Sequence, residues 1–189
     1  MGKINLLLIG LGHHAKRIYY QICKKEEGNL DVQIVHGVDL TEKKADIKEY
    51  LKKQGSNLPM YYVDSKNQTN HLSQGVEKEL NKIVDLYKIK GVIVSTEPLA
   101  HKKYAIWALG KGLHIFMDKP ISASLNTSIS EDSAKQIIKD FDDLGRLYKK
   151  TKAAYKNQLF TIMVQRRYHP AFIKVRDLIR EVFQATNCP

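Results

Sequence analysis

The chain has 189 residues, 43% of them hydrophobic and 27% charged, with a formal net charge of +11. This composition is ordinary for a soluble globular protein, and no apolar run approaches the ~20 residues of a membrane-spanning helix. We therefore expect no membrane association. The basic residues are spread along the chain, often beside Glu or Asp, which indicates solvated helix faces. No recognised nucleic-acid-reading motif accompanies them, so the pattern argues against DNA or RNA as a partner.

Two cysteines, Cys23 and Cys188, lie far apart and form no metal or redox spacing. They fit a reducing cytoplasm best, and Cys23 is expected to be a buried thiol in a helix. The apolar run Leu6–Ile9 is too short for a signal peptide and leads into a Gly-rich turn, so it predicts a buried strand.

The first part of the chain predicts a strand, a helix and a second strand, which make a βαβ unit. In chain order these are Ile4–Ile9, His13 to about Lys25, and Val32–Asp39. Helical spacing predicts that Ile18, Tyr19 and Ile22 face the sheet. Gly28 is expected to end the helix in a left-handed conformation.

The rest of the chain continues this alternation. In chain order it predicts a helix at Glu42–Gln54, a strand at Met60–Val63, a polar loop at Asp64–Ser73, a helix at Gln74–Lys88, a strand at Lys90–Thr96, a helix at Ala100–Lys111, a strand at Leu113–Met117, a polar connection at Ile121–Ser130, a helix at Glu131–Tyr155, a strand at Leu159–Gln165 and a last helix from His169-Pro170. The spacing of Ser128 and Glu131 suggests a capping box. The predicted fold class is α/β, a doubly wound and mostly parallel sheet of Rossmann type.

A glycine-rich turn follows the first strand. Gly10-Leu11-Gly12-His13-His14-Ala15 matches G-x-G-x-x-A, in which the glycines permit a tight turn and a close approach to pyrophosphate, while Ala15 allows close helix–strand packing. Asp39 ends the second strand, where a carboxylate can accept hydrogen bonds from ribose hydroxyls. This context favours a dinucleotide site over a turn that merely links strand and helix.

The dinucleotide is predicted to be NAD or NADP. Asp39 favours NAD because its charge would oppose a 2′-phosphate, although Lys43 and Lys44 could hold that phosphate. His13 and His14 point about 100° apart on a helix, so they cannot easily share a metal ion, and no metal site is predicted. One of them is expected near the cofactor phosphates.

A second constellation follows the fourth and fifth strands, whose carboxyl ends should face the same crevice. It consists of Ser95, Thr96, Glu97, Pro98 and His101, and then Asp118, Lys119 and Pro120. Lys119 could donate a proton to a carbonyl oxygen during hydride transfer, which makes it the candidate catalytic residue. The alternative is a solvated lysine in a Lys-Pro turn.

With these segments, and Val164–Pro170 after them, the sequence resembles the Gfo/Idh/MocA oxidoreductases. The resemblance implies an NAD(P)-dependent oxidoreductase that transfers hydride to or from a sugar or cyclitol. It also implies that Lys119 lies near the nicotinamide and that the remaining segments contribute to the cofactor site. By position, those residues are Gly10, Gly12, His13, His14, Ala15, Asp39, Ser95, Thr96, Glu97, Pro98, His101, Asp118, Arg166 and Arg167.

The chain departs from the family in two respects. It has Asp-Lys-Pro where the family usually has Glu-Lys-Pro, and only 24 residues follow Gln165. We expect a dinucleotide-binding domain at 1–165 and the start of a truncated C-terminal substrate domain, with its first helix, at 166–189. Two hypotheses stay open, an enzyme, favoured by Lys119, and a catalytically incomplete nucleotide-binding module. A homo-oligomer is compatible with the resemblance.

Overall fold

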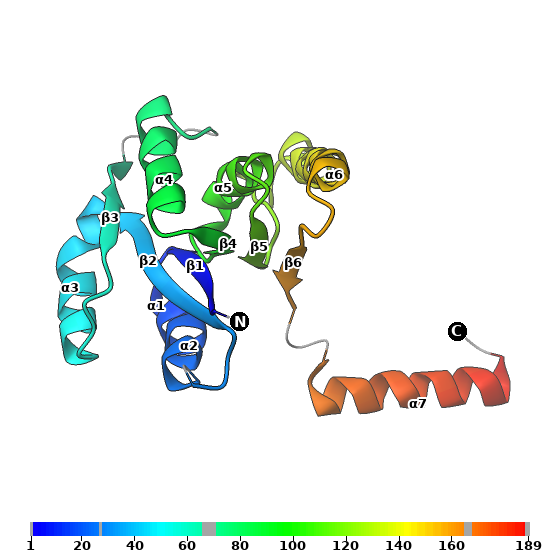
Figure 1. The fold of residues 1–189 in the computed structure, drawn as a ribbon. Helices are drawn as coiled ribbons and strands as arrows, with labels where there is room; N and C mark the ends of the chain where they lie inside the picture. The colour runs from blue at the N-terminus through cyan, green and yellow to red at the C-terminus, as the bar shows by residue number, and fades with distance from the viewer. Residues whose placement is uncertain (1, 27, 66–70, 165–167, 188–189) are drawn as a thin grey trace.

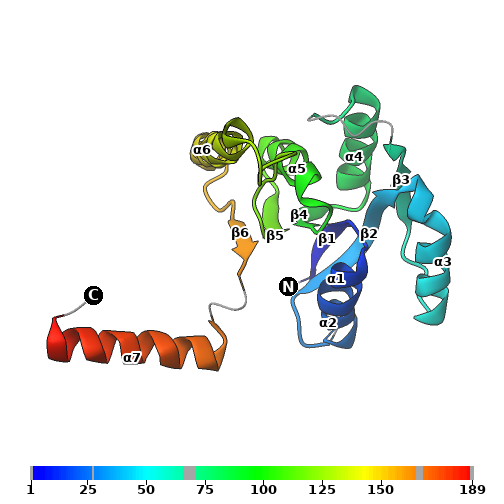
Figure 2. The same cartoon turned by 180° about the vertical axis from the view of Figure 1, so that it is seen from behind.

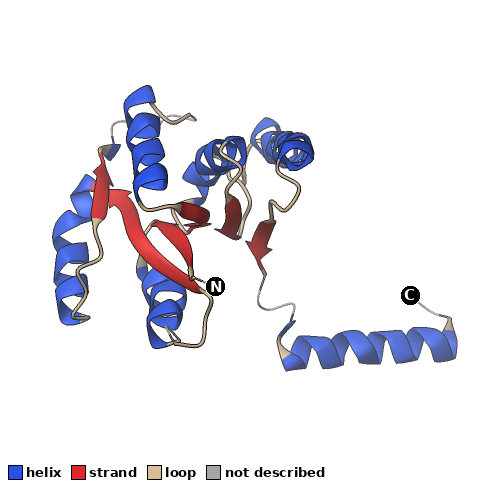
Figure 3. Ribbon diagram, viewed as in Figure 1, coloured by secondary structure: helices blue, strands red, loops and turns tan. Residues whose placement is uncertain are grey.

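A computed structural model describes residues 2–26, 28–65, 71–164 and 168–187. Its centre is a six-stranded sheet in the order β3-β2-β1-β4-β5-β6, and the strand pairs are all parallel (Figures 1 and 3). The order reverses between β1 and β4, which makes a topological switch point there. The predicted doubly wound Rossmann sheet is therefore confirmed.

The elements follow the predicted alternation closely. The strands are β1 (Ile4–Ile9), β2 (Val32–Leu40), β3 (Met60–Val63), β4 (Ile89–Val94), β5 (His114–Asp118) and β6 (Phe160–Met163). The helices are α1 (His13–Ala15), η1 (Lys16–Tyr20), α2 (Gln21–Lys25), η2 (Thr41–Lys43), α3 (Lys44–Lys53), α4 (Gln74–Leu86), α5 (Pro98–Gly110), α6 (Glu131–Ala154) and α7 (Pro170–Thr186). Most differences from prediction are of one or two residues at element ends.

Helices cover both faces of the sheet (Figures 1 and 2). Each face has its own hydrophobic core. On one face, α4, α5 and α6 bury residues such as Leu80, Trp107 and Leu144 against the strands. On the other, the helix after β1 and α3 bury Tyr19, Tyr20 and Ile47. Strands covered on both faces read as continuous apolar runs, which is why Leu6–Ile9 shows no alternation.

The helix after β1 contains a π-turn, η1, between α1 and α2. The wider turn shifts the residues that follow it around the helix axis. Tyr19 and Tyr20 are both buried as a result, whereas Ile22 is 49% exposed, so the prediction that Ile22 faces the sheet was wrong. Gly28 does not cap this helix, because the helix ends at Lys25 and Glu26 is its C-cap residue, so that prediction was wrong.

Two other helix starts differ from the prediction. The cap of α6 is Ser130, whose hydroxyl accepts a hydrogen bond from the Ser133 amide, so the Ser128 capping box was wrong. Helix α5 begins at Pro98, two residues earlier than expected, because proline fits the first turn, where its missing N–H is not needed.

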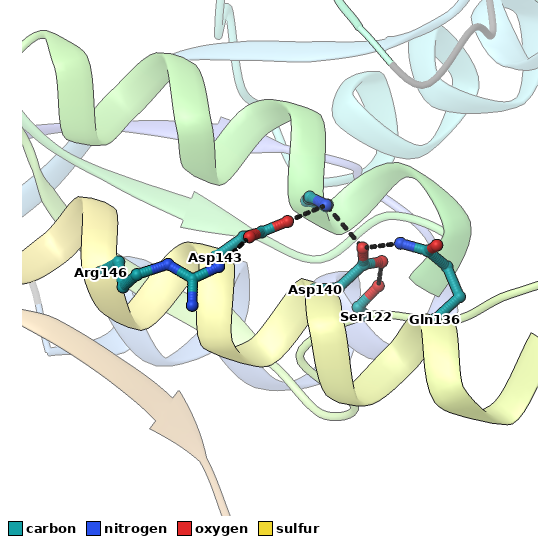
Figure 4. Close-up of polar contacts among 6 residues, drawn as sticks. Ser122, Gln136, Asp140, Asp143 and Arg146 are labelled. Atoms are coloured by element: carbon teal, nitrogen blue, oxygen red, sulfur yellow. Dashed lines mark hydrogen bonds and ion pairs between the residues drawn. The ribbon is translucent and has the colours of Figure 1, made fainter.

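A polar network fastens α6 to α5 (Figure 4). Lys102 Nζ on α5 lies 2.5 Å from Asp140 Oδ1 and 3.4 Å from Asp143 Oδ2 on α6. Ser122 and Gln136 donate further hydrogen bonds to Asp140 at 2.5 and 2.7 Å. Burial would raise the pKa of Asp140, but Lys102 and these donors outweigh it and hold the pKa below 3.8.

Helix α7 stands apart from the sheet and its covering helices (Figures 1 and 2). His169 caps it and Pro170 occupies its first turn, as predicted. The predicted apolar stripe is present but exposed, with Phe172, Val175, Ile179 and Val182 all more than half accessible. In the described part of the chain, neither α7 nor another helix has the length and apolar character to cross a membrane.

Candidate functional site

The carboxyl ends of β1, β2, β4 and β5 surround a cavity of about 230 Å³ at the switch point of the sheet. Ligands of open α/β sheets bind at this place, because the loops diverge there to opposite faces. The lining comes from the glycine turn, the ends of these strands, Val63 of β3, and α5. It consists of Ile9, Gly10, Gly12, His13, His14, Val38, Asp39, Leu40, Lys43, Val63, Ser95, Thr96, Glu97, Ala100, Lys103, Tyr104 and Asp118.

The two glycines of the turn do different work. Gly10 has φ +90°, and a Cβ there would lie 2.4 Å from the carbonyl oxygen of Ser95, so the turn packs directly against the end of β4. A Cβ on Gly12 would meet no atom within 4 Å. Protein packing therefore explains the first glycine but not the second. Open space beside Gly12, at the start of a helix, fits the approach of a phosphate group.

Asp39 lies at the β2 end of the cavity and is only 7% exposed. Its Oδ2 accepts a hydrogen bond from the Leu11 amide at 2.6 Å, and its Oδ1 accepts one from the Leu40 amide at 2.7 Å. The carboxylate thus ties the glycine turn to the end of β2. Each carboxylate oxygen can accept more than one hydrogen bond, so Asp39 keeps acceptor capacity for a ribose hydroxyl.

A second carboxylate, Asp118, lies at the β5 end. Tyr19 donates a hydrogen bond to its Oδ1, and Ser95 donates one to its Oδ2. His14 Nε2 lies 3.4 Å from the same Oδ1. These four residues, which we call the Asp118 cluster, come from the first helix, the end of β4 and the end of β5. Burial, reinforced by Asp118, raises the pKa of Tyr19 far above its ordinary value, so its hydroxyl stays protonated.

The segment after β4 divides between the cavity and the scaffold. Ser95, Thr96 and Glu97 line the cavity. His101 is 1% exposed, with Nδ1 at 2.7 Å from the Pro120 carbonyl oxygen and Nε2 at 3.0 Å from that of Thr96. It therefore joins the loop after β4 to the Lys119-Pro120 bond, which is cis. Pro98 and His101 are absent from the cavity lining among the described residues.

The other predicted site residues are placed as follows. Ala15 is fully buried beneath the turn. Lys119 is exposed and directly follows Asp118 at the end of β5. Lys43 lines the cavity near Asp39, whereas Lys44 Nζ lies 5.4 Å from the centre of the Tyr62 ring. Arg166 and Arg167 lie outside the described residues.

One face of α5 lines the cavity and was missed in the sequence. Ala100, Lys103 and Tyr104 stand at i, i+3 and i+4, which places them on one side of a helix. Lys103 is 7% exposed, and burial lowers its pKa. Burial, with a smaller effect of Asp39, raises the pKa of Tyr104 to about 12. This spacing, directly after the fourth strand, could have signalled the face.

The chemistry of the lining is that of an organic ligand site. Within the residues that the structure describes, no group of three or more His, Cys, Asp or Glu side chains could hold a metal ion. The cavity combines a glycine turn, a carboxylate at each end and a buried lysine. This donor set suits a ligand with a phosphate in its middle and hydroxyl groups beside it.

Residues 4–148 match the model of the oxidoreductase family with an NAD-binding Rossmann fold, Gfo/Idh/MocA. The chain belongs to this family. The match covers most of the sequence, including the glycine turn, Asp39 and the Asp118 cluster. The predicted resemblance to the Gfo/Idh/MocA oxidoreductases is thereby confirmed. Among curated proteins, no sequence matches this chain.

Solved structures of Gfo/Idh/MocA type share the fold. An aldose-aldose oxidoreductase from Caulobacter crescentus, crystallised with glycerol, is 19% identical with a TM-score of 0.60, covering 95% of this chain and 43% of its own. A scyllo-inositol dehydrogenase from Lactobacillus casei, with NAD(H) and scyllo-inositol bound, is 16% identical with a TM-score of 0.59, covering 95% and 42%. A family oxidoreductase from Vibrio cholerae is 15% identical with a TM-score of 0.61, covering 95% and 44%. This Gfo/Idh/MocA chain therefore spans about two fifths of the length of these structures.

Proposed function

We propose that this chain binds NAD or NADP in the switch-point cavity and serves hydride transfer to or from a sugar or cyclitol. The observation that carries the proposal is the order of groups along the cavity. Asp39 lies at one end, the Gly10–Gly12 turn borders the middle, and Asp118 lies at the other end, followed by Lys119. An extended dinucleotide has hydroxyls, phosphates and a nicotinamide in that order.

The residues present fit such a cofactor. Asp39 would accept hydrogen bonds from the adenosine ribose, and the open space at Gly12 would admit the pyrophosphate at the start of the helix. Ser95, Thr96 and Glu97 would border the nicotinamide end. His13, Ala15, Pro98, His101, Arg166 and Arg167 stay predictions as parts of the site, and His101 and Ala15 would act through packing.

The bound nicotinamide would supply hydride chemistry, exchanging a hydride with a carbon that carries a hydroxyl or carbonyl group. Lys119 would contribute the charge or the proton that the oxygen of that group needs. Its exposed position after β5 supports this role, because a substrate could reach it from solvent. The Asp118 cluster would fix the strand end from which Lys119 projects.

For the cofactor we favour NAD. Asp39 is a buried carboxylate at the ribose end, and a 2′-phosphate would meet its charge. Lys43 and Lys103 line the same cavity and favour NADP instead. The relative affinities for the two cofactors therefore measure which effect is larger. The sugar or cyclitol class is suggested by the solved relatives named for an aldose and for scyllo-inositol.

A nucleotide-binding module without catalysis of its own is the second candidate. The observation that favours it is that, within the described residues, the cavity lining comes from the Rossmann sheet, its loops and α5. We propose a dinucleotide-binding domain at 1–165 and the start of a substrate domain at 166–189. Cytoplasmic location and self-association stay predictions.

Titration with NADH and NADPH, followed by nicotinamide fluorescence, tests the proposal. We expect NADH to bind more tightly than NADPH, and Asp39→Ser to narrow the difference between them. Turnover with a panel of sugars and cyclitols, lost in Lys119→Gln but with binding retained, would support the enzyme. Binding without turnover would favour the module, and failure of both cofactors to bind would contradict the proposal.

A further inference from the structure

The Asp118 cluster brings a histidine to the far end of the cavity from Asp39. His14 lines the cavity, and its Nε2 lies 3.4 Å from Asp118 Oδ1. The side chain of His14 is 47% exposed, whereas that of Asp118 is 14% exposed. A solvent-accessible imidazole therefore rests on a largely buried carboxylate, at the end of the cavity opposite the ribose-binding position.

The π-turn makes this arrangement. In an α-helix, side chains five positions apart point about 140° away from each other. The wider turn of η1 takes up one extra residue. His14 and Tyr19 thus reach the same carboxylate, and their rings meet edge to face with centroids 5.8 Å apart. π-Helical turns are common at functional sites, and here the turn places His14 and Tyr19 beside Asp118.

We propose that His14, supported by Asp118, is the group that binds and releases a proton at the nicotinamide end of the cofactor site. The inference rests on the proposed function, since it needs a dinucleotide in the cavity. It assigns to His14 a role other than contact with the cofactor phosphates. His14 would be an acid–base residue in addition to Lys119.

Asp118 suits the role of support because its other contacts fix it. Tyr19 and Ser95 donate to its two oxygens, so the carboxylate cannot turn away from His14. Because Nε2 is the ring nitrogen that lies 3.4 Å from Asp118, Nδ1 is the nitrogen on which a proton from substrate can be accepted. A carboxylate that orients an imidazole and stabilises its protonated form is a recurring acid–base arrangement.

The other charged groups of the cavity are arranged differently. His13 is the neighbour of His14 but points about 100° away on the helix. Glu97 and Lys103 line the wall formed by the loop after β4 and by α5, and Asp39 and Lys43 lie at the β2 end. Lys119 is exposed and directly follows Asp118. Among the described residues that line the cavity, His14 is the histidine that lies against Asp118.

The role has a clear chemical consequence. When an alcohol is oxidised, its carbon loses a hydride to the cofactor and its hydroxyl loses a proton. His14 would accept that proton, so that the substrate O–H bond breaks and an N–H bond forms on the ring, and the proton then leaves to solvent. Before any reaction, the positive nicotinamide of NAD⁺ should disfavour the protonated ring, whereas the neutral nicotinamide of NADH should not.

Calorimetric titration of the full chain with NAD⁺ and with NADH, near pH 6.5, tests the inference. Repeating each titration in buffers of different ionisation enthalpy measures the protons released on binding. We expect NAD⁺ to release a fraction of a proton and NADH to release less. NAD⁺ affinity should also weaken roughly three- to tenfold between pH 8 and pH 6.

His14→Gln should abolish the difference in proton release, and His13→Gln should keep it, because His13 would meet only the phosphates that both cofactors share. Asp118→Asn should reduce the release, since the imidazolium loses its counter-charge. Unchanged release in His14→Gln, or NAD⁺ binding without release by the unaltered chain, would overturn this inference alone. Failure of both cofactors to bind would overturn the proposed function and this inference together.

Discussion

Two carboxylates, the buried Asp39 and the partly buried Asp118, lie at opposite ends of one cavity and are held by different kinds of donor. Asp39 accepts hydrogen bonds from two backbone amides, those of Leu11 and Leu40. Asp118 accepts hydrogen bonds from the Tyr19 and Ser95 side chains and lies beside His14. At the Asp39 end, backbone amides donate the hydrogen bonds. At the other end, three side chains from distant parts of the chain supply the contacts.

This difference teaches where the site can be altered. Backbone donors persist through most substitutions, so the Asp39 end can be changed mainly at Asp39 itself. Side-chain donors can be removed one at a time, so the Asp118 end is open to graded changes. The glycine turn lies between the two carboxylates. Its Leu11 amide donates to Asp39, and Gly10 packs against the backbone of Ser95, whose hydroxyl donates to Asp118.

Substitution of Gly10 should have the largest effect because it disturbs both ends at once. In Gly10→Ala, the Cβ would clash with the Ser95 carbonyl at φ +90°, and we expect a loss of about 3–5 kcal/mol in unfolding free energy. Urea denaturation measures it. Gly12→Ala is the matched control, since its Cβ meets open space. It should change stability by less than about 1 kcal/mol but abolish NADH binding. Equal destabilisation by both variants would contradict the different roles.

Removal of the Asp39 carboxylate should have the second-largest effect. Asp39→Ala leaves the amides of Leu11 and Leu40 without their charged acceptor. We expect the unfolding free energy to fall by about 2–3 kcal/mol. Thermal or urea unfolding gives the value, and NADH titration should show weaker binding in parallel. Asp39→Asn keeps an acceptor oxygen and should cost less. A variant as stable as the parent would show that the backbone donors find water instead.

At the Asp118 end we expect smaller, separable effects. Tyr19→Phe removes one donor and keeps the ring that packs on Phe116, so it should cost about 1 kcal/mol. Ser95→Ala should cost a similar amount, and the double variant should cost more than the sum because the carboxylate then loses both hydroxyl donors. Urea denaturation of the three variants forms the cycle. Strict additivity would indicate that the two donors act independently.

Asp140 lies outside the cavity, and its substitution should have the smallest effect on stability. Its pKa is held below 3.8 against the effect of burial, so the folded state binds fewer protons than the unfolded chain in that range. Its contribution is present above pH 3.8 and is lost as the pH falls through the lower, folded-state pKa. The difference in unfolding free energy between the parent and Asp140→Asn should therefore decrease as the pH drops from 6 to 3. The gap at pH 6 should stay below about 1 kcal/mol, since Lys102 is partly exposed and keeps Asp143. Urea denaturation at several pH values measures it, and a constant gap would contradict the assignment.

Local patterns in the sequence predicted the fold class and the residues at the Asp39 end of the cavity. Apolar runs bounded by turns predicted six strands, and β1 and β3 have the predicted bounds. Gly10, Gly12 and Asp39 were identifiable because each performs its role within one βαβ unit. Hydrogen bonds between near neighbours in sequence and topology leave such signatures, because few arrangements of the chain satisfy them.

The sequence also placed Ser95 and Asp118 in one crevice, but only the tertiary structure showed that Tyr19 and His14 join them there. Tyr19 and Asp118 lie 99 positions apart, and their hydrogen bond depends on a π-turn that no spacing of apolar residues announced. The same turn exposed Ile22, which a regular helix would have buried. Likewise, the spacing of Ala100, Lys103 and Tyr104 marks one face of α5, but only the packing of α5 beside β4 shows that this face lines the cavity. Contacts between distant side chains depend on how elements pack, and a local pattern carries no information about that packing.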